Sequence, residues 1–322
     1  MNFIKKRLFS KRILFIDGMG RVGKSMISRI IPHLDKCEQI EFFESLEHIL
    51  LGLSTKDVSI KFAKSYINNQ INLLYYNKKI ARRVNFRLED VSSSKNFNNR
   101  IYEKRQKLDE NEGKRLFLNE NWIHPFFTHD LILNLKYLKK IISNFQILEI
   151  YRDPFDVVYS WFNKGWGKRL YDKNEAVDFS LKYKYKNYNL PFYVKGYEKK
   201  WINLNEVEKC AVIVKNNIIN SINNQKKNKL SNIFTLSYED FLINPLQLTN
   251  HICKFLKTKK NKYLHKSITK NNLPDKISKK IQNKKKEFIL DNISRETGKE
   301  LIVLQENYCK EIYGLKKYSL KN

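Results

Sequence analysis

Apolar residues in this chain fall into short runs, and each run ends in a polar or glycine-containing turn that leads into a segment with helical spacing. Residues 13–16 are apolar, residues 17–20 form such a turn, and residues 26–31 have amphipathic spacing. A short uninterrupted apolar run is typical of a strand buried on both faces, and the spacing after it is typical of a helix. The order of these segments predicts the opening of a β-α-β unit.

The same alternation recurs along the chain. Further strands are expected at residues 41–43, 126–129, 145–150 and 234–238, with helices near 46–51, after Asp130, from Asp153-Pro154 and from Asn244-Pro245. Asp153 is expected to cap its helix with Pro154 at the first helical position, and Asp130 to cap the helix that follows it. Strands that alternate with helices predict an α/β fold with a mainly parallel central sheet flanked by helices.

Two segments depart from this alternation. Residues 56–115 are polar, have helical spacing, and contain no proline and almost no glycine, so we expect a helical insertion there. Residues 257–286 are rich in Lys and Asn and predict a solvated, mobile basic segment. A chain of 322 residues can bury one large core, and we expect residues 1–322 to form a single domain that carries both segments.

Composition narrows the function classes. Hydrophobic residues make up 42% of the chain, with 20 Phe and 18 Tyr, which predicts a packed globular protein. The formal net charge of +29 suggests a polyanionic partner. However, Lys, Asn, Ile, Phe and Tyr are all over-used together, as AT-rich codons would produce. No known module for reading DNA or RNA is present, so we expect no specific nucleic-acid partner, and an anionic small molecule fits the charge equally well.

The sequence shows neither a long apolar segment nor a metal-binding spacing of cysteines, and these two features bear on the location and on metal binding. The apolar run at residues 13–16 is too short for a signal sequence or a membrane span, so we expect no transmembrane segment and a cytoplasmic location. The cysteines have no paired spacing of the kind that predicts zinc, a redox dithiol or a disulfide framework, and they stand at Cys37, Cys210, Cys253 and Cys309. The sequence makes no prediction about oligomeric state.

A glycine-rich loop carries the first chemical signal. The segment from Gly18 to Ser25 fits the pattern G-x-x-x-x-G-K-S and lies between an expected strand and an expected helix. In such a loop, backbone N–H groups surround a phosphate. This motif alone favours a P-loop kinase or NTPase, with Lys24 on the β- and γ-phosphates of Mg-ATP or Mg-GTP and Ser25 on Mg²⁺. That activity also needs a carboxylate after an apolar strand, and neither Asp17 nor Asp153 is convincing.

A second motif changes the interpretation. In the segment Tyr151-Arg152-Asp153-Pro154-Phe155-Asp156-Val157-Val158-Tyr159-Ser160, an Arg ends a strand and a Ser lies about two helical turns further on, so both side chains can converge on one anion. This segment resembles the R-[ND]-P-x-D-x-x-x-S motif of the sulfotransferase superfamily, which binds the 3′-phosphate of 3′-phosphoadenosine 5′-phosphosulfate (PAPS). The resemblance implies that Arg152 and Ser160 bind this phosphate. The structural alternative is an Arg152 ion pair with Asp153 or Asp156.

Three more segments resemble the family in the same order. The family's phosphosulfate loop, K-x-G-T-T, corresponds to Arg21, Gly23, Lys24 and Ser25. Thr128-His129 is similar to a T-H dipeptide whose His acts as base. The segment from Ser237 to Phe241, followed by Asn244-Pro245, resembles Y-E-D-x-x-x-x-P, whose Tyr, here Tyr238, lies beside adenine. The resemblance runs from about residue 13 to residue 256 and implies a three-layer P-loop-type fold, with donor contacts from Gly20, Arg21, Val22, Gly23, Lys24, Ser25, Met26, Arg152, Ser160 and Tyr238.

The sequence also departs from the family pattern. Lys24-Ser25 replaces Thr-Thr, so either Arg21 or Lys24 is the cation that stabilises the bridging oxygen. Phe127 stands where a Lys often precedes the T-H pair, and no R-K-G segment occurs near the C-terminus. Part of the family's 3′-phosphate site is therefore missing or supplied by other residues.

Taken together, the motifs predict a PAPS-dependent sulfotransferase that moves a sulfuryl group to a hydroxyl or amine acceptor, with carbohydrates among the acceptors, and releases PAP. The expected catalytic residues are His129, Lys24 and Arg21, with no metal required; a hydrogen-bonded structural His129 is the alternative.

We expect the helical insertion at 56–115 to cover the acceptor as a lid. Trp161, Phe162 and Trp166 line the acceptor site or belong to the core. The rival functions are a P-loop kinase or NTPase and a non-catalytic nucleotide- or polyanion-binding module.

Overall fold

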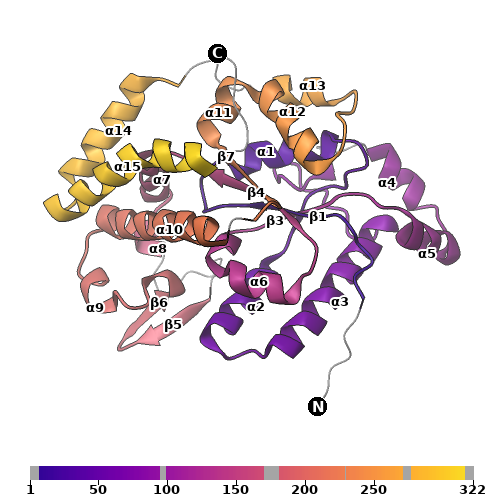
Figure 1. Ribbon diagram of the computed structural model, residues 1–322, viewed down its shortest axis with the longest axis horizontal. Coiled ribbons are helices and arrows are strands. Elements are labelled where there is room, and N and C mark those ends of the chain that lie inside the picture. The colour runs from indigo at the N-terminus through magenta and orange to yellow at the C-terminus, as the bar shows by residue number, and fades with distance from the viewer. Residues whose placement is uncertain (1–6, 95–98, 170–180, 229, 271–276, 316–322) are drawn as a thin grey trace.

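A five-stranded parallel sheet forms the centre of the protein, in a computed structural model that describes residues 7–94, 99–169, 181–228, 230–270 and 277–315. The strands lie in the order β2-β3-β1-β4-β7, and each neighbouring pair is parallel. Their bounds are Ile13–Asp17 (β1), Glu41–Phe42 (β2), His124–Phe127 (β3), Gln146–Tyr151 (β4) and Ile233–Ser237 (β7). The predicted α/β fold with a parallel sheet is confirmed (Figure 1).

Helices cover both faces of this sheet, because its strands are apolar on both sides. In β1, Leu14 and Ile16 join one buried cluster and Ile13 and Phe15 join the other, as the two-residue period of a strand requires. The first cluster includes residues of α1 (Lys24–Ile30), α7 (Pro154–Asn163), α10 (Glu206–Asn228), α12 (Pro245–Leu256) and α15 (Arg295–Leu315). The second includes residues of α2 (Glu44–Thr55), α3 (Ile60–Lys79) and α6 (Leu135–Ile141). The three-layer arrangement is therefore confirmed.

The parallel register brings the loops of interest to one edge. Ile16 lies opposite Phe127 on one side and Leu148 on the other, so β1, β3 and β4 end at nearly the same level. The loops that follow these strands carry the glycine-rich segment, Thr128-His129 and Arg152-Asp153. Ligands of open parallel sheets bind outside the carboxyl ends of the strands, so this edge is where a site is expected.

The first residues of two helices show whether Asp153 and Asp130 cap them as predicted. The Asp153 side chain accepts hydrogen bonds from the backbone N–H groups of Phe155 and Asp156, and Pro154 is the first residue of α7, as predicted. The prediction for Asp130 is wrong. Asp130 has φ 54° and makes no side-chain capping bond to the 3-10 helix η3 (Leu131–Asn134) that follows it, so its carboxyl group is available for the site described below.

In the described part of residues 56–115, α3 and α4 (Asn99–Arg105) lie within this range, and α5 (Glu110–Asn119) begins in it. The expected lid role is wrong for α3, because Ala63, Ile67 and Ile71 of this helix are buried in the core against the sheet layer. A buried ion-pair cluster ties its end to the sheet: Lys79 and Arg105 both bind Glu38. Burial alone would raise the pKa of Glu38, but the two cations outweigh it and lower this pKa to about 2.

Several elements were not anticipated from the sequence. They are α8 (Trp166–Arg169), the antiparallel hairpin of β5 (Lys182–Tyr185) and β6 (Tyr188–Pro191), the 3-10 helix η4 (Phe192–Val194), α9 (Glu198–Trp201), α11 (Tyr238–Ile243), α13 (Leu264–Lys270) and α14 (Lys279–Asp291). Helices α13 and α14 overlap the segment predicted to be mobile, of which residues 271–276 lie outside the described residues. Within the described ranges, no helix is both long enough and apolar enough to span a bilayer.

Candidate active site

Aromatic side chains hold the glycine-rich loop between β1 and α1 in place. A Cβ on Gly20 would lie 2.8 Å from the Trp166 ring, and a Cβ on Gly23, whose φ is 96°, would lie 2.1 Å from the Tyr238 ring. Trp161 donates a hydrogen bond from Nε1 to the Gly20 carbonyl oxygen at 2.9 Å. Glycine is required at both positions, and the two tryptophans support the loop rather than line an acceptor site.

Lys24 lies beneath the loop. Its ammonium group donates hydrogen bonds to the carbonyl oxygens of Gly18 and Met19, and it lies 5.1 Å from the centre of the Phe127 ring. Burial lowers the pKa of Lys24, and nearby carboxyl groups, first Asp17, oppose this shift. Lys24 is therefore a cation enclosed by the protein on the side of the loop that faces β3.

Arg21 points in the other direction, toward α7. Its Nε donates a hydrogen bond to Ser160 Oγ at 3.0 Å, and its backbone carbonyl accepts one from Arg152 Nη1 at 3.1 Å. The Arg152 guanidinium lies 4.7 Å from the centre of the Tyr238 ring, and the Tyr238 hydroxyl contacts Met26 Sδ at 3.2 Å. Five of the predicted donor-binding residues thus converge on one side of the loop, and Lys24 lies on the opposite side.

His129 follows β3 and pairs with Glu47 of α2. Glu47 Oε1 accepts a hydrogen bond from the His129 backbone N–H at 2.8 Å and lies 3.2 Å from His129 Nδ1. Burial raises the pKa of Glu47 to about 8. The His129 side chain keeps 37% of its surface exposed, and the surrounding protein and then the Lys24 ammonium lower its pKa. A proton on Nδ1 that is donated to Glu47 leaves Nε2 free to accept another proton.

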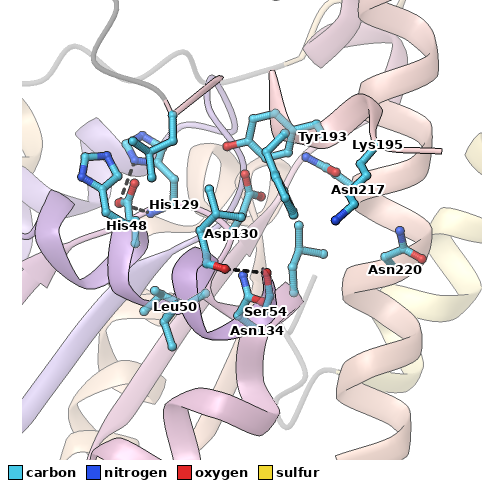
Figure 2. Close-up of a pocket in the computed structure, with 16 residues that line it drawn as sticks. His48, Leu50, Ser54, His129, Asp130, Asn134, Tyr193, Lys195, Asn217 and Asn220 are labelled. Atoms are coloured by element: carbon cyan, nitrogen blue, oxygen red, sulfur yellow. Dashed lines mark hydrogen bonds and ion pairs between the residues drawn. The ribbon is translucent and has the colours of Figure 1, made fainter. Parts of the chain in front are cut away.

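A cavity of about 420 Å³ opens beside this pair. Figure 2 shows His48 and His129 on one wall, Asn217 and Asn220 of α10 on the opposite wall, and Tyr193 and Lys195 above them. The Tyr193 hydroxyl donates a hydrogen bond to the Asp130 carboxyl group, and burial raises the pKa of Asp130 to about 7. The lining of the cavity thus includes several hydrogen-bonding groups, and Glu47, His129 and Asp130 are among them.

Sequence reasoning missed Glu47, Asp130 as a pocket residue, and Tyr193. Glu47 could have been found, because it lies in the first turn of the helix that follows β2, at the edge of the sheet where ligands bind. Tyr193 gave no signal, because it belongs to η4, whose neighbours in the sequence carry no motif. Among the described residues that line the cavity, none belongs to the predicted helical insertion; the cover comes from the region after β6.

Comparisons with known proteins identify relatives. A family model described as "Sulfotransferase domain" matches residues 18–318. Among curated proteins, none matches the chain. Similar solved structures include a sulfotransferase domain from the curacin biosynthetic pathway, at 13% identity, covering 80% of this chain and 77% of that one, with a TM-score of 0.41.

A second similar structure is the sulfotransferase domain of the Synechococcus PCC 7002 olefin synthase, at 13% identity, with all of both chains covered and a TM-score of 0.40. A third is a sulfotransferase from Mycobacterium avium, at 10% identity, with 89% of this chain and 78% of that one covered and a TM-score of 0.41. At these identities and TM-scores, the assignment to a family rests on the match over residues 18–318.

Proposed function

This chain belongs to the sulfotransferase family and takes its sulfuryl group from PAPS, and we propose that the acceptor is a hydroxyl group of a polar, carbohydrate-like compound bound in the cavity beside His129. The observation that carries this proposal is the lining of the cavity. Ser54, Asn134, Asn220 and Lys195 offer hydrogen-bond donors and acceptors around its wall. Ser54 and Asn134 are half-buried, and Asn220 and Lys195 are exposed, so all four can exchange bonds to water for bonds to a ligand that carries several hydroxyl groups.

The carboxyl groups of the cavity favour a neutral hydroxyl over an amine. Burial raises the pKa values of Asp130 to about 7 and of Glu47 to about 8. Near neutral pH these groups therefore carry less negative charge than ordinary carboxylates, which weakens their attraction for an ammonium group. A hydroxyl acceptor needs only hydrogen bonds from them.

In the proposed mechanism, His129 accepts the proton of the acceptor hydroxyl at Nε2 while the acceptor oxygen bonds to sulfur. In its ionised form, which prevails above its pKa of about 8, Glu47 holds His129 in the required tautomer through Nδ1 and stabilises the charge that the ring gains. The bond between sulfur and the bridging phosphate oxygen breaks in the same step, and the loop residues Gly20, Val22, Gly23, Ser25 and Met26 surround the phosphate that leaves as part of PAP.

The two cations have different roles in this proposal. Lys24 influences the pKa values of Glu47, His129 and Asp130, which supports a location of its ammonium close to the reacting atoms. Arg21 bonds Ser160 instead, on the side of Arg152. Lys24 is therefore the cation that neutralises the bridging oxygen, and Arg21, Arg152, Ser160 and Tyr238 hold the adenosine end with its 3′-phosphate.

A panel of acceptors tests the proposal. The purified protein is incubated with PAPS and mono- and disaccharides, amino sugars, simple phenols or apolar alcohols, and PAP release and sulfated product are measured. Sugars are expected to accelerate PAP release more than apolar alcohols. Asn220→Ala is expected to raise the KM for the sugar several-fold without changing PAP affinity, because Asn220 lines only the acceptor cavity. Turnover confined to apolar alcohols would contradict the proposed acceptor, and PAP binding without turnover of any acceptor would favour a non-catalytic module.

A further inference from the structure

The 3′-phosphate region has a neighbour that no motif indicated. Helix α14 packs against α7, with Phe288 in contact with the rings of Tyr159, at 5.7 Å between centroids, and Phe162, at 5.3 Å. This packing directs Lys285 toward α7, where its ammonium binds Asp156 Oδ1 at 2.5 Å. Gln282, one turn earlier, donates a hydrogen bond to Asp156 Oδ2 at 3.4 Å.

Asp156 lies on the same face of α7 as Ser160, because residues four apart on a helix are neighbours, at about 5–6 Å between their Cβ atoms. Arg152 Nη2 lies 3.9 Å from Asp156 Oδ2, and Arg21 bonds Ser160. Lys285, Arg152 and Arg21 therefore meet around one side of α7, beside Ser160.

The charges in this region do not balance. Three cationic side chains lie around one carboxyl group, that of Asp156. Glu239 also lies in the region, but burial raises its pKa to about 7. Asp153 is occupied by the N-terminus of α7 and by Gln305, and burial raises its pKa as well. The net positive charge favours the binding of a further anion.

An unpaired buried group supports the same conclusion. Arg152 Nε is buried and has no hydrogen-bond partner in the described part of the chain. Buried N–H groups of native proteins are nearly always paired, so such a group commonly marks the place of a ligand or ion. A phosphate beside Arg152 would accept this bond and would balance the charge.

We propose that Lys285 of α14 is a further ligand of the donor's 3′-phosphate and discriminates PAPS from nucleotides that lack this group. The inference rests on the proposed binding of the adenosine end by Arg152 and Ser160. Asp156 holds the Lys285 ammonium at the site before the donor binds. Lys285 thus supplies a cation from α14 where the chain has no R-K-G segment. The ammonium of its neighbour Lys286 bonds Gln305 and lies 5.1 Å from the centre of the Phe155 ring.

The test measures affinities for PAP and for AMP, which lacks the 3′-phosphate, by titration calorimetry on the full chain. Lys285→Ala is expected to weaken PAP binding by about 10- to 100-fold, the usual loss for a charge-assisted contact, and to leave AMP binding within about twofold of the unmodified protein. Lys285→Arg is expected to restore most of the PAP affinity, and Arg152→Ala serves as the positive control. The matched control is Lys284→Ala, which removes an exposed lysine from the same helix.

The outcomes separate the possibilities. A Lys285→Ala variant that binds PAP as the unmodified protein does would overturn the inference. Equal losses for PAP and AMP would also overturn it, because they would mean that Lys285 acts only by supporting the fold. A loss of PAP affinity in Lys284→Ala as large as that in Lys285→Ala would indicate a general charge effect and would contradict a specific ligand. If the unmodified protein fails to bind PAP at all, the proposed donor site itself is wrong and the inference falls with it.

Discussion

At the scale of single residues, the proposed role of His129 as the base makes its pairing with Glu47 decide which protonation state would be active. Nδ1 must carry a proton and donate it to Glu47 if Nε2 is to accept the acceptor's proton. That arrangement requires an ionised Glu47. Since burial raises the pKa of Glu47 to about 8, protonation of this carboxyl group, and not of the imidazole, is expected to limit the rate on the acidic side.

This argument gives a prediction for pH dependence. In the unmodified protein, kcat should rise with pH through about 8, because below that value Glu47 is protonated and can donate to Nδ1. In Glu47→Gln the amide oxygen still accepts from Nδ1, so the acidic limb should move below pH 6.5, since the pKa of His129 is lowered from that value. In His129→Ala, kcat should fall by about 10²- to 10⁴-fold with PAP affinity unchanged.

Steady-state rates from pH 5 to 10 under saturating PAPS, together with PAP titrations, check these outcomes. If Glu47→Gln abolishes turnover while His129→Ala retains it, Glu47 is the base and His129 only positions it. If neither variant changes the rate or its pH profile, the proton leaves by another route and both assignments are wrong.

At the scale of elements, the conformation of the glycine-rich loop between β1 and α1 depends on the side chains packed around it as much as on its own glycines. Gly23, whose φ is 96°, is the N-cap residue immediately before α1 and lies against the Tyr238 ring at the start of α11. Gly23→Ala is expected to destabilise the protein by about 1–3 kcal/mol, because the new Cβ forces a strained backbone and displaces Tyr238. PAP affinity should fall with it, since the loop N–H groups lose their arrangement.

Chemical denaturation and PAP titration measure the two effects. Gly314→Ala is the matched control, because a Cβ at this position in α15 meets no atom within 4 Å and alanine favours a helix. It should leave PAP affinity unchanged and should not destabilise the protein. Equal behaviour of the two variants would mean that the close contact between Gly23 and Tyr238 does not constrain the loop.

At the scale of the whole molecule, whose net charge is +29, cationic side chains occur in contrasting environments. Some cations lie in buried pairs, such as Lys79 and Arg105 on Glu38, and others, namely Arg21, Arg152 and Lys285, converge where the charge is not balanced. The second group predicts that an anionic nucleotide with a 3′-phosphate stabilises the fold.

Thermal unfolding with PAP, AMP and ATP tests this prediction. PAP without added metal should raise the stability by about 2.7 kcal/mol at a hundredfold excess over its Kd, and AMP should raise it less at the same concentration. A larger stabilisation by ATP that depends on Mg²⁺ would contradict the assignment of the donor.

The sequence by itself determined the central sheet and the place of the glycine-rich loop between β1 and α1, because buried strands, glycine turns and the Asp153-Pro154 cap are local signals that short segments carry. It also indicated Arg152 and Ser160, since their spacing on one helix brings them to the same side. It misjudged Asp130, whose positive φ excludes the expected capping bond. It also assigned the cover of the acceptor site to residues 56–115, whereas the described residues that line the cavity on that side follow β6.

Only the tertiary structure decided which distant residues share a site. Glu47 meets His129 from a different helix, Tyr193 reaches Asp130 from η4, and Lys285 meets Asp156 across the contact between α14 and α7. These pairs are separated by many residues and carry no common spacing, and the packing of helices on the two faces of the sheet creates them. Burial, which shifts the pKa values of these groups, is likewise a property of the folded chain and not of any segment.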